Sequence, residues 1–198
     1  MSAAVGEKGI PSPLAAGRDP FSVLVGTIIS LRTRDAVTGP VTERVLERAP
    51  DPAAMAAIET EELALLLRPA GFFNRKAQQL KLISKILLER YRGRVPDTRK
   101  ELEALPGVGG KTAAFVLSMG FGKPAICVDV HVHRISNRLG IVETATPEET
   151  EKALMEFFPL ELWIPLNHVF VRFGQRICLP RRPSCAVCPF NDWCRNAS

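Results

Sequence analysis

The segment Leu105-Pro-Gly-Val-Gly-Gly-Lys111 constrains the fold most, because a proline and three glycines within seven residues require a tight turn. Helical patterns lie on both sides of the segment, which therefore predicts a helix, a hairpin and a second helix. The backbone N–H groups of such a hairpin can hold a phosphate, and the following helix start adds a partial positive charge. Lys111 is then either a phosphate ligand or a nucleophile.

The spacing around Lys111 argues against a nucleotide-binding P-loop. That loop needs a glycine four residues ahead of its Gly-Lys-Ser/Thr, and the required position is Leu105. A helix-hairpin-helix fits better, because Gly107 and Gly109 permit positive φ and close approach to a DNA phosphate without reading sequence. We predict that the hairpin residues Gly107, Val108, Gly109 and Gly110 bind DNA.

The rest of the chain reads as almost entirely helical, which makes the fold class all-α. Asp-Pro pairs at 19–20 and 51–52 are helix starts, and Thr60 is expected to cap a helix over 61–68. The longest helix is expected over 74–92, and further helices over 98–105, 111–119, 147–158 and 165–177. Residues 1–18 are expected to form a loosely ordered arm, and 126–132 a loop leading into a helix rather than a strand.

The composition favours a polyanionic partner. The net charge is +5 over 198 residues, which is mildly basic and suits nucleic acid. No apolar run approaches the ~20 residues that span a bilayer, and the N-terminus has no signal-peptide pattern. We expect a cytoplasmic, nucleoid-associated monomer with no membrane partner.

Four of the five cysteines crowd one short stretch at 178–194, with the spacing Cys178-x6-Cys185-x2-Cys188-x5-Cys194. Four thiolates can hold zinc or a [4Fe–4S] cluster, and a single short Cys-x2-Cys pair favours the cluster over a zinc ribbon. Cys127 is expected to be a buried small hydrophobe instead. Arg181 and Arg182, inside the loop, either contact phosphates or offset the negative charge of the cluster.

A carboxylate follows Lys111 at a distance of 18 residues, in Val-Asp129-Val-His. Asp129 is either the N-cap of a helix beginning near Val130 or a functional carboxylate that assists Lys111. The role of three further arginines is likewise open. Each is either a phosphate contact or an ordinary solvated charge: Arg138, Arg172 and Arg176.

Together, the hairpin lysine, the Val-Asp-x-His segment and the cysteine spacing resemble endonuclease III, from about Phe21 to Cys194. The resemblance includes the segment Gly71-Phe-Phe-Asn-Arg-Lys76, similar to a family segment that enters DNA. It implies two helical domains flanking a DNA-binding cleft: a six-helix barrel with the hairpin at 16–123, and a [4Fe–4S] cluster domain formed by 1–15 and 124–198.

The resemblance also implies a reaction. The family removes damaged pyrimidines from double-stranded DNA and cleaves abasic sites. The damaged nucleotide is flipped out of the stack, Lys111 attacks the sugar to form a Schiff base, and β-elimination cuts the strand. Asp129 would assist, while the four cysteines of the quartet would hold the cluster.

Two departures from the family pattern concern the side chains that enter the DNA. Arg32 stands where the family usually has glutamine, and an arginine can pair bidentately with an orphan guanine. Phe72 replaces a common leucine, beside Ala70 where a larger aliphatic is usual. Phe72 could stack on a base as a wedge or belong to the core.

Three alternatives have distinct consequences. Monofunctional thymine or adenine mismatch glycosylases share the fold but usually lack the hairpin lysine. A non-catalytic binder of DNA structure would not need both Lys111 and Asp129. A ferredoxin-like electron carrier would be small and acidic rather than basic and helical.

Overall fold

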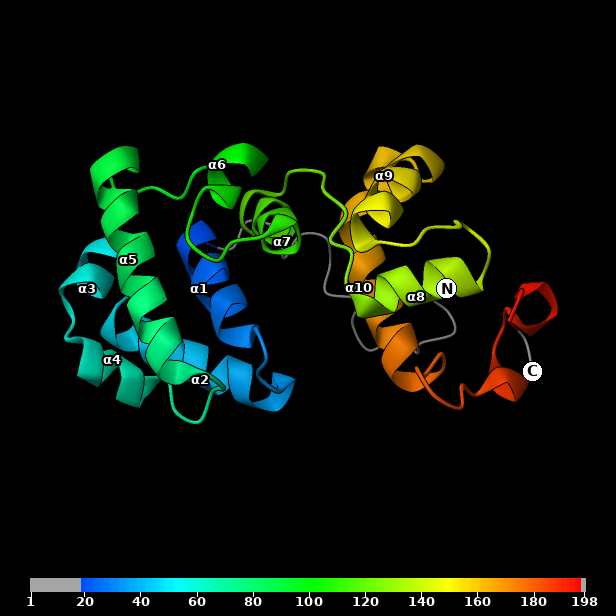
Figure 1. Ribbon diagram of the computed structural model, residues 1–198, viewed down its shortest axis with the longest axis horizontal. Coiled ribbons are helices and arrows are strands. Elements are labelled where there is room, and N and C mark those ends of the chain that lie inside the picture. Colours follow the sequence, from blue (N-terminus) through cyan, green and yellow to red (C-terminus); the bar gives the residue numbers. More distant parts are fainter. Residues whose placement is uncertain (1–18, 197–198) are drawn as a thin grey trace. The chain divides into compact units, whose positions relative to one another are not determined.

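A computed structural model describes residues 19–196 of the chain; the arm expected at 1–18 lies outside these residues. The described part consists of helices and connecting turns without a β-strand, so the all-α prediction is confirmed (Figure 1). Contacts divide the chain into two compact units. We call their described parts the hairpin unit, 19–121, and the C-terminal unit, 122–196.

The hairpin unit is built from seven α-helices: α1 Pro20–Ser30, α2 Asp35–Arg48, α3 Pro52–Ala57, α4 Thr60–Leu66, α5 Phe73–Tyr91, α6 Arg99–Glu103 and α7 Gly110–Phe121. The described C-terminal unit holds α8 Val130–Arg138, α9 Pro147–Phe157 and α10 Trp163–Arg176, with the 3₁₀ turns η3 Leu160–Leu162, η4 Cys185–Val187 and η5 Asn191–Trp193.

Local start signals place several helices where the sequence predicts them. The Asp19 carboxylate accepts the Ser22 N–H at 2.8 Å, and Asp51 accepts the Ala54 N–H at 2.8 Å. Thr146 and Glu149 form a reciprocal capping box ahead of α9. Residues 122–129 have no regular structure and lead into α8, as expected for a loop.

Local sequence predicted one wrong helix cap and missed one helix. Thr60 does not cap α4, because the helix already includes it and Glu59 is the N-cap without a side-chain hydrogen bond. The helix α2 is not among the helices expected from the sequence, and Pro40 lies inside it. The residues Val41 and Val45 are buried there, so packing overrides the propensity of the Gly-Pro pair.

Each unit has its own apolar core. In the hairpin unit, α1 is buried on most sides and α5 buries the stripe Ala77, Leu80, Ile83 and Leu87. In the C-terminal unit, the core joins α8, α9 and α10 with the preceding loop, through Ile126, Val128, Val132, Ile135, Val142, Leu154, Leu166, Phe170 and Phe173. Phe173 meets Phe190 of the cysteine segment edge to face, with ring centroids 5.7 Å apart.

Among residues 19–196, no helix is both long enough and apolar enough to cross a bilayer.

The capping box of α9 yields a stability prediction. Thr146→Ala should lower the free energy of unfolding by ~1 kcal/mol, because the Glu149 N–H loses its side-chain acceptor. Thr146→Ser keeps a hydroxyl and should stay close to wild type. Urea denaturation of the three proteins measures the difference, and equal stability of the alanine and serine variants would contradict the role of the cap.

Candidate functional site

The hairpin before α7 is closed by its own backbone and anchored to α5. Gly107 has φ +71°, and the Val108 N–H donates to the Leu105 carbonyl at 3.1 Å. The Gln79 side-chain N–H donates to the Pro106 carbonyl at 2.8 Å. A Cβ on Gly107 would lie 2.5 Å from Gln79 Nε2, so a side chain there would displace the Gln79 amide from the hairpin.

The hairpin surface around Gly109 is not covered by neighbouring side chains. A Cβ on Gly109 would meet nothing within 4 Å, whereas Val108 is only 5% exposed and packs inward. Val108 therefore shapes the hairpin, and the exposed backbone of Gly107 and Gly109 is what an approaching phosphate can reach. Lys111 is exposed in the first turn of α7, where the partial positive charge of the helix start is strongest.

Asp129 is the N-cap of α8, as one of its two interpretations predicts. Its Oδ1 accepts the N–H groups of His131 and Val132, both at 2.9 Å. The side chain remains partly exposed. The capping role fixes the carboxylate at the start of α8 and is compatible with a second, chemical role.

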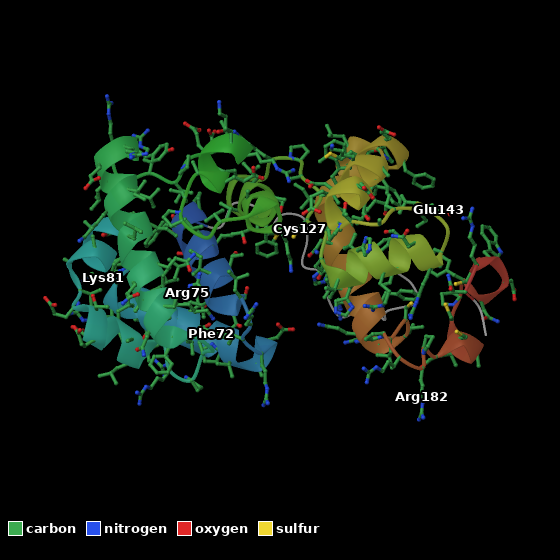
Figure 2. The ribbon with its side chains drawn as sticks, viewed as in Figure 1. Phe72, Arg75, Lys81, Cys127, Glu143 and Arg182 are labelled. Atoms are coloured by element: carbon green, nitrogen blue, oxygen red, sulfur yellow. The ribbon has the colours of Figure 1, made fainter. Side chains whose placement is uncertain are left out.

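Arg32 and Phe72 come together on the surface of the hairpin unit. The Arg32 guanidinium carbon lies 5.5 Å from the centroid of the Phe72 ring, a cation–π distance. Phe72 is 58% exposed, so the interpretation of this residue as a core phenylalanine is wrong; Ala70 is the buried neighbour, at 2%. Figure 2 shows Phe72 at the start of α5.

A buried lysine ties the two turns that carry this pair. Lys76 Nζ donates to the Ile29 carbonyl at 2.6 Å and to the Thr33 hydroxyl at 2.7 Å. The same hydroxyl accepts the Gly71 N–H at 3.3 Å. Sequence reasoning missed this role, since Lys76 reads as one more polar residue of the α5 surface.

The four cysteines of the quartet line one cavity, as their spacing predicts, together with Arg138, Phe173 and Asn191. No group of three His, Cys, Asp or Glu side chains within residues 19–196 is arranged to hold a single metal ion. A [4Fe–4S] cluster does not need such an arrangement, because each thiolate binds a different iron of the cluster. The four thiols around one cavity could thus provide the ligand set of a [4Fe–4S] cluster.

Two arginines of α8 hold the segment that begins at Cys178. Arg138 donates to the Leu179 and Pro180 carbonyls at 2.7 and 2.9 Å and to Cys178 Sγ at 3.5 Å. Arg134 donates to the Cys178 carbonyl at 2.8 Å. Arg138 therefore has a structural role that neither interpretation included, as a donor to the backbone after Cys178. Arg134 and Arg138 are four residues apart and therefore lie on one face of α8. This spacing is the sequence signal that could have revealed their shared role.

The remaining candidates are placed as follows. Arg181 and Arg182 are exposed, and Figure 2 shows the Arg182 side chain directed away from the ribbon. Arg182 has φ +52°, so the loop turns sharply there. Cys127 is 2% exposed and stands outside the cavity, which confirms its interpretation as a buried hydrophobe.

A helix-hairpin-helix followed by a cysteine-lined cavity defines a class of DNA repair proteins. Residues 25–160 match the HhH-GPD superfamily of base excision DNA repair proteins. Residues 178–194, which run from the first to the last cysteine of the quartet, match the iron-sulfur binding domain of endonuclease III. The chain belongs to the endonuclease III family and is a base excision repair enzyme that binds DNA and a [4Fe–4S] cluster.

Individual relatives agree with this assignment. Endonuclease III of Thermotoga maritima is 49% identical over 176 residues, covering 89% of this chain and 83% of that protein. A trapped endonuclease III–DNA covalent intermediate, an estranged-adenine complex, matches 92% of this chain and 86% of its own at 38% identity, with a TM-score of 0.86. The chain spans about half the length of the Arabidopsis thaliana homologues that it matches.

A thermostable thymine-DNA glycosylase is also similar, with a TM-score of 0.83 and 28% identity over 98% of this chain and 91% of that one. The fold is therefore shared by enzymes with different named substrates, and substrate preference has to be argued from particular residues.

The buried lysine leads to a prediction about pH. Desolvation lowers the pKa of Lys76 from its usual 10.5, so between the folded and unfolded pKa values the unfolded chain binds more protons. Stability then rises with pH across that window. In urea denaturation, wild type should gain unfolding free energy relative to Lys76→Met as the pH rises toward the usual lysine pKa of 10.5. Parallel pH profiles of the two proteins would contradict the burial effect.

Proposed function

We propose that the protein removes oxidised or otherwise damaged pyrimidines from double-stranded DNA and cleaves the resulting abasic site through a Schiff base. The observation that carries the proposal is the placement of Lys111, exposed in the first turn of α7 directly after the phosphate-binding hairpin. A relative trapped as a covalent DNA intermediate supports a nucleophile of this kind in the family.

In the proposed reaction, the neutral Lys111 amine attacks C1′ of a flipped-out nucleotide and the damaged base leaves. Opening of the sugar gives the Schiff base. Loss of a C2′ proton then expels the 3′ phosphate, which cuts the strand. Asp129 stabilises positive charge on the sugar and assists the proton transfers, while the amides around Gly107 and Gly109 hold the DNA backbone.

The cluster ligands are proposed to be Cys178, Cys185, Cys188 and Cys194. When bound, the cluster supplies a structural centre that orders the loop with Arg181 and Arg182, which we propose contact DNA phosphates. We further propose a domain boundary between residues 123 and 124, and a monomer that acts on nucleoid DNA; the expected contribution of 1–15 to the second domain lies outside the described residues. The division of contacts at residues 121 and 122 supports the proposed boundary.

Borohydride trapping tests the proposed nucleophile. Wild-type protein incubated with abasic duplex DNA and borohydride should form a covalent adduct, and Lys111→Ala should form none, because no amine is left to make the imine. Lys85→Ala, which removes an exposed lysine of α5, should trap like wild type. Failure of the wild type to form an adduct would overturn the lyase assignment.

The same assay distinguishes the proposed enzyme from a monofunctional mismatch glycosylase. The similarity to a thymine-DNA glycosylase favours this alternative. That enzyme would release thymine from a G·T mismatch without forming the adduct. A protein that binds abasic DNA but releases no base and forms no adduct would instead be the non-catalytic binder.

Arg32 is proposed to favour lesions opposite guanine, because its guanidinium can pair bidentately with the orphaned base. Single-turnover excision should be about tenfold faster opposite guanine than opposite adenine, a difference within the range of one bidentate contact. Arg32→Gln should remove most of this preference. Equal rates against all four opposite bases in the wild type would contradict the role of Arg32.

Loss of a proposed cluster ligand has a spectroscopic readout. Cys188→Ser should strongly reduce the broad absorption near ~400 nm expected of a thiolate-bound iron–sulfur cluster, and should lower the iron content. Cys127→Ala serves as the matched control, because this thiol lies outside the cavity, and it should keep the absorption. An unchanged spectrum for Cys188→Ser would remove this cysteine from the ligand set.

A further inference from the structure

The first turns of α5 carry a lysine whose charge is withdrawn from water. Lys76 is 4% exposed, and its ammonium is held by the Ile29 carbonyl and the Thr33 hydroxyl. A buried ammonium costs free energy that an apolar side chain of similar size would not. Packing of α5 therefore does not by itself account for a lysine at this position.

The first acceptor lies where α1 ends. The Thr33 N–H donates to the Ser30 carbonyl at 3.0 Å, so the Ile29 carbonyl lacks its helical partner four residues on. Lys76 satisfies this carbonyl from another helix, and a cation is favourable at a helix C-terminus. The chain can then turn sharply directly after α1, and Arg32 adopts φ +53°.

The second acceptor joins this turn to the turn before α5. The Thr33 hydroxyl is shared between Lys76 and the Gly71 N–H. A Cβ on Gly71 would lie 2.6 Å from the Arg32 carbonyl oxygen, so the two turns are in direct backbone contact. This contact is what brings the Arg32 guanidinium over the Phe72 ring.

Both members of that pair are strained. Arg32 and Phe72 have φ +53° and +57°, a left-handed conformation that is unfavourable for a non-glycine residue. Strain of this kind persists where the surroundings impose it, and it gathers at functional sites. The hydrogen bonds of Lys76 and Thr33 are the surroundings that impose it here.

We propose that Lys76 is a positioning residue for the opening of DNA. By tying the end of α1 to the turn before α5, it holds Arg32 and Phe72 in the arrangement that enters the base stack. The inference rests on the DNA-opening role proposed for that pair, and it adds a residue that touches neither DNA nor the reacting atoms.

Comparing two substrates separates positioning from chemistry. A damaged pyrimidine in a duplex must be flipped out, whereas an abasic site in single-stranded DNA has no stack to open. Lys76→Met should slow single-turnover excision from the duplex by about 10- to 100-fold, the range seen for misplaced groups. Borohydride trapping on the single-stranded abasic oligonucleotide should stay within about twofold of wild type, since Lys111 is untouched.

Lys81→Met is the matched control. Lys81 is also on α5, and it donates to the Ile58 carbonyl at the end of α3. This variant loses a comparable tie between helices but leaves both DNA-facing turns intact. It should show no selective loss on the duplex substrate, even where its melting temperature falls.

Thr33→Val gives a second, milder variant, because it removes the shared hydroxyl and leaves the lysine. It should show the same pattern as Lys76→Met. Equal losses on the duplex and the single strand, or none on either, in both variants would overturn the positioning role. Failure of the proposed function is distinguishable, because the wild type itself would then form no adduct or release no damaged base.

Discussion

The ammonium of Lys76 is the interaction on which the proposed DNA-facing side of the hairpin unit depends. It joins the end of α1 to the turn that precedes α5. One turn further along α5, Gln79 holds the hairpin through the Pro106 carbonyl. Residues three apart lie on the same helix face, so a single stretch of α5 sets the spacing between the Arg32–Phe72 pair and the hairpin glycines.

Cationic side chains that complete helix ends recur through the molecule. Arg44 donates to the Leu66 carbonyl at the end of α4, and Lys81 does so at the end of α3. In the C-terminal unit, Arg134 and Arg138 serve the irregular segment after α10 in the same manner. Carbonyls without helical partners need donors, and this chain supplies them from long basic side chains.

This use of basic residues qualifies the argument from charge. A net charge of +5 favours a polyanionic partner, but some of the cationic side chains donate hydrogen bonds to backbone carbonyls. Lys76, Arg134 and Arg138 donate hydrogen bonds to backbone carbonyls of the fold. Arg181 and Arg182, on the segment between the cysteines, are exposed instead.

Local patterns predicted most of the helices, since an aspartate or threonine cap and a following proline act within one turn of the chain. The hairpin and the gathering of the cysteines also follow from short spacings. The roles of Lys76 and Arg138 did not, because their partners lie 47 and 41 residues away in sequence. The helix α2 was missed for a related reason, since buried valines outweigh its Gly-Pro pair only once a core exists.

The contact at Gly71 has a consequence for how the protein can change. Because no side chain fits between its Cα and the Arg32 carbonyl, the frame that joins the two turns tolerates little variation. The side chains at 32 and 72 point outward from that frame and are exposed. Under the role proposed for Arg32 and Phe72, preference for the base opposite a lesion can therefore be re-engineered by substituting two residues, with the backbone beneath them left as it is.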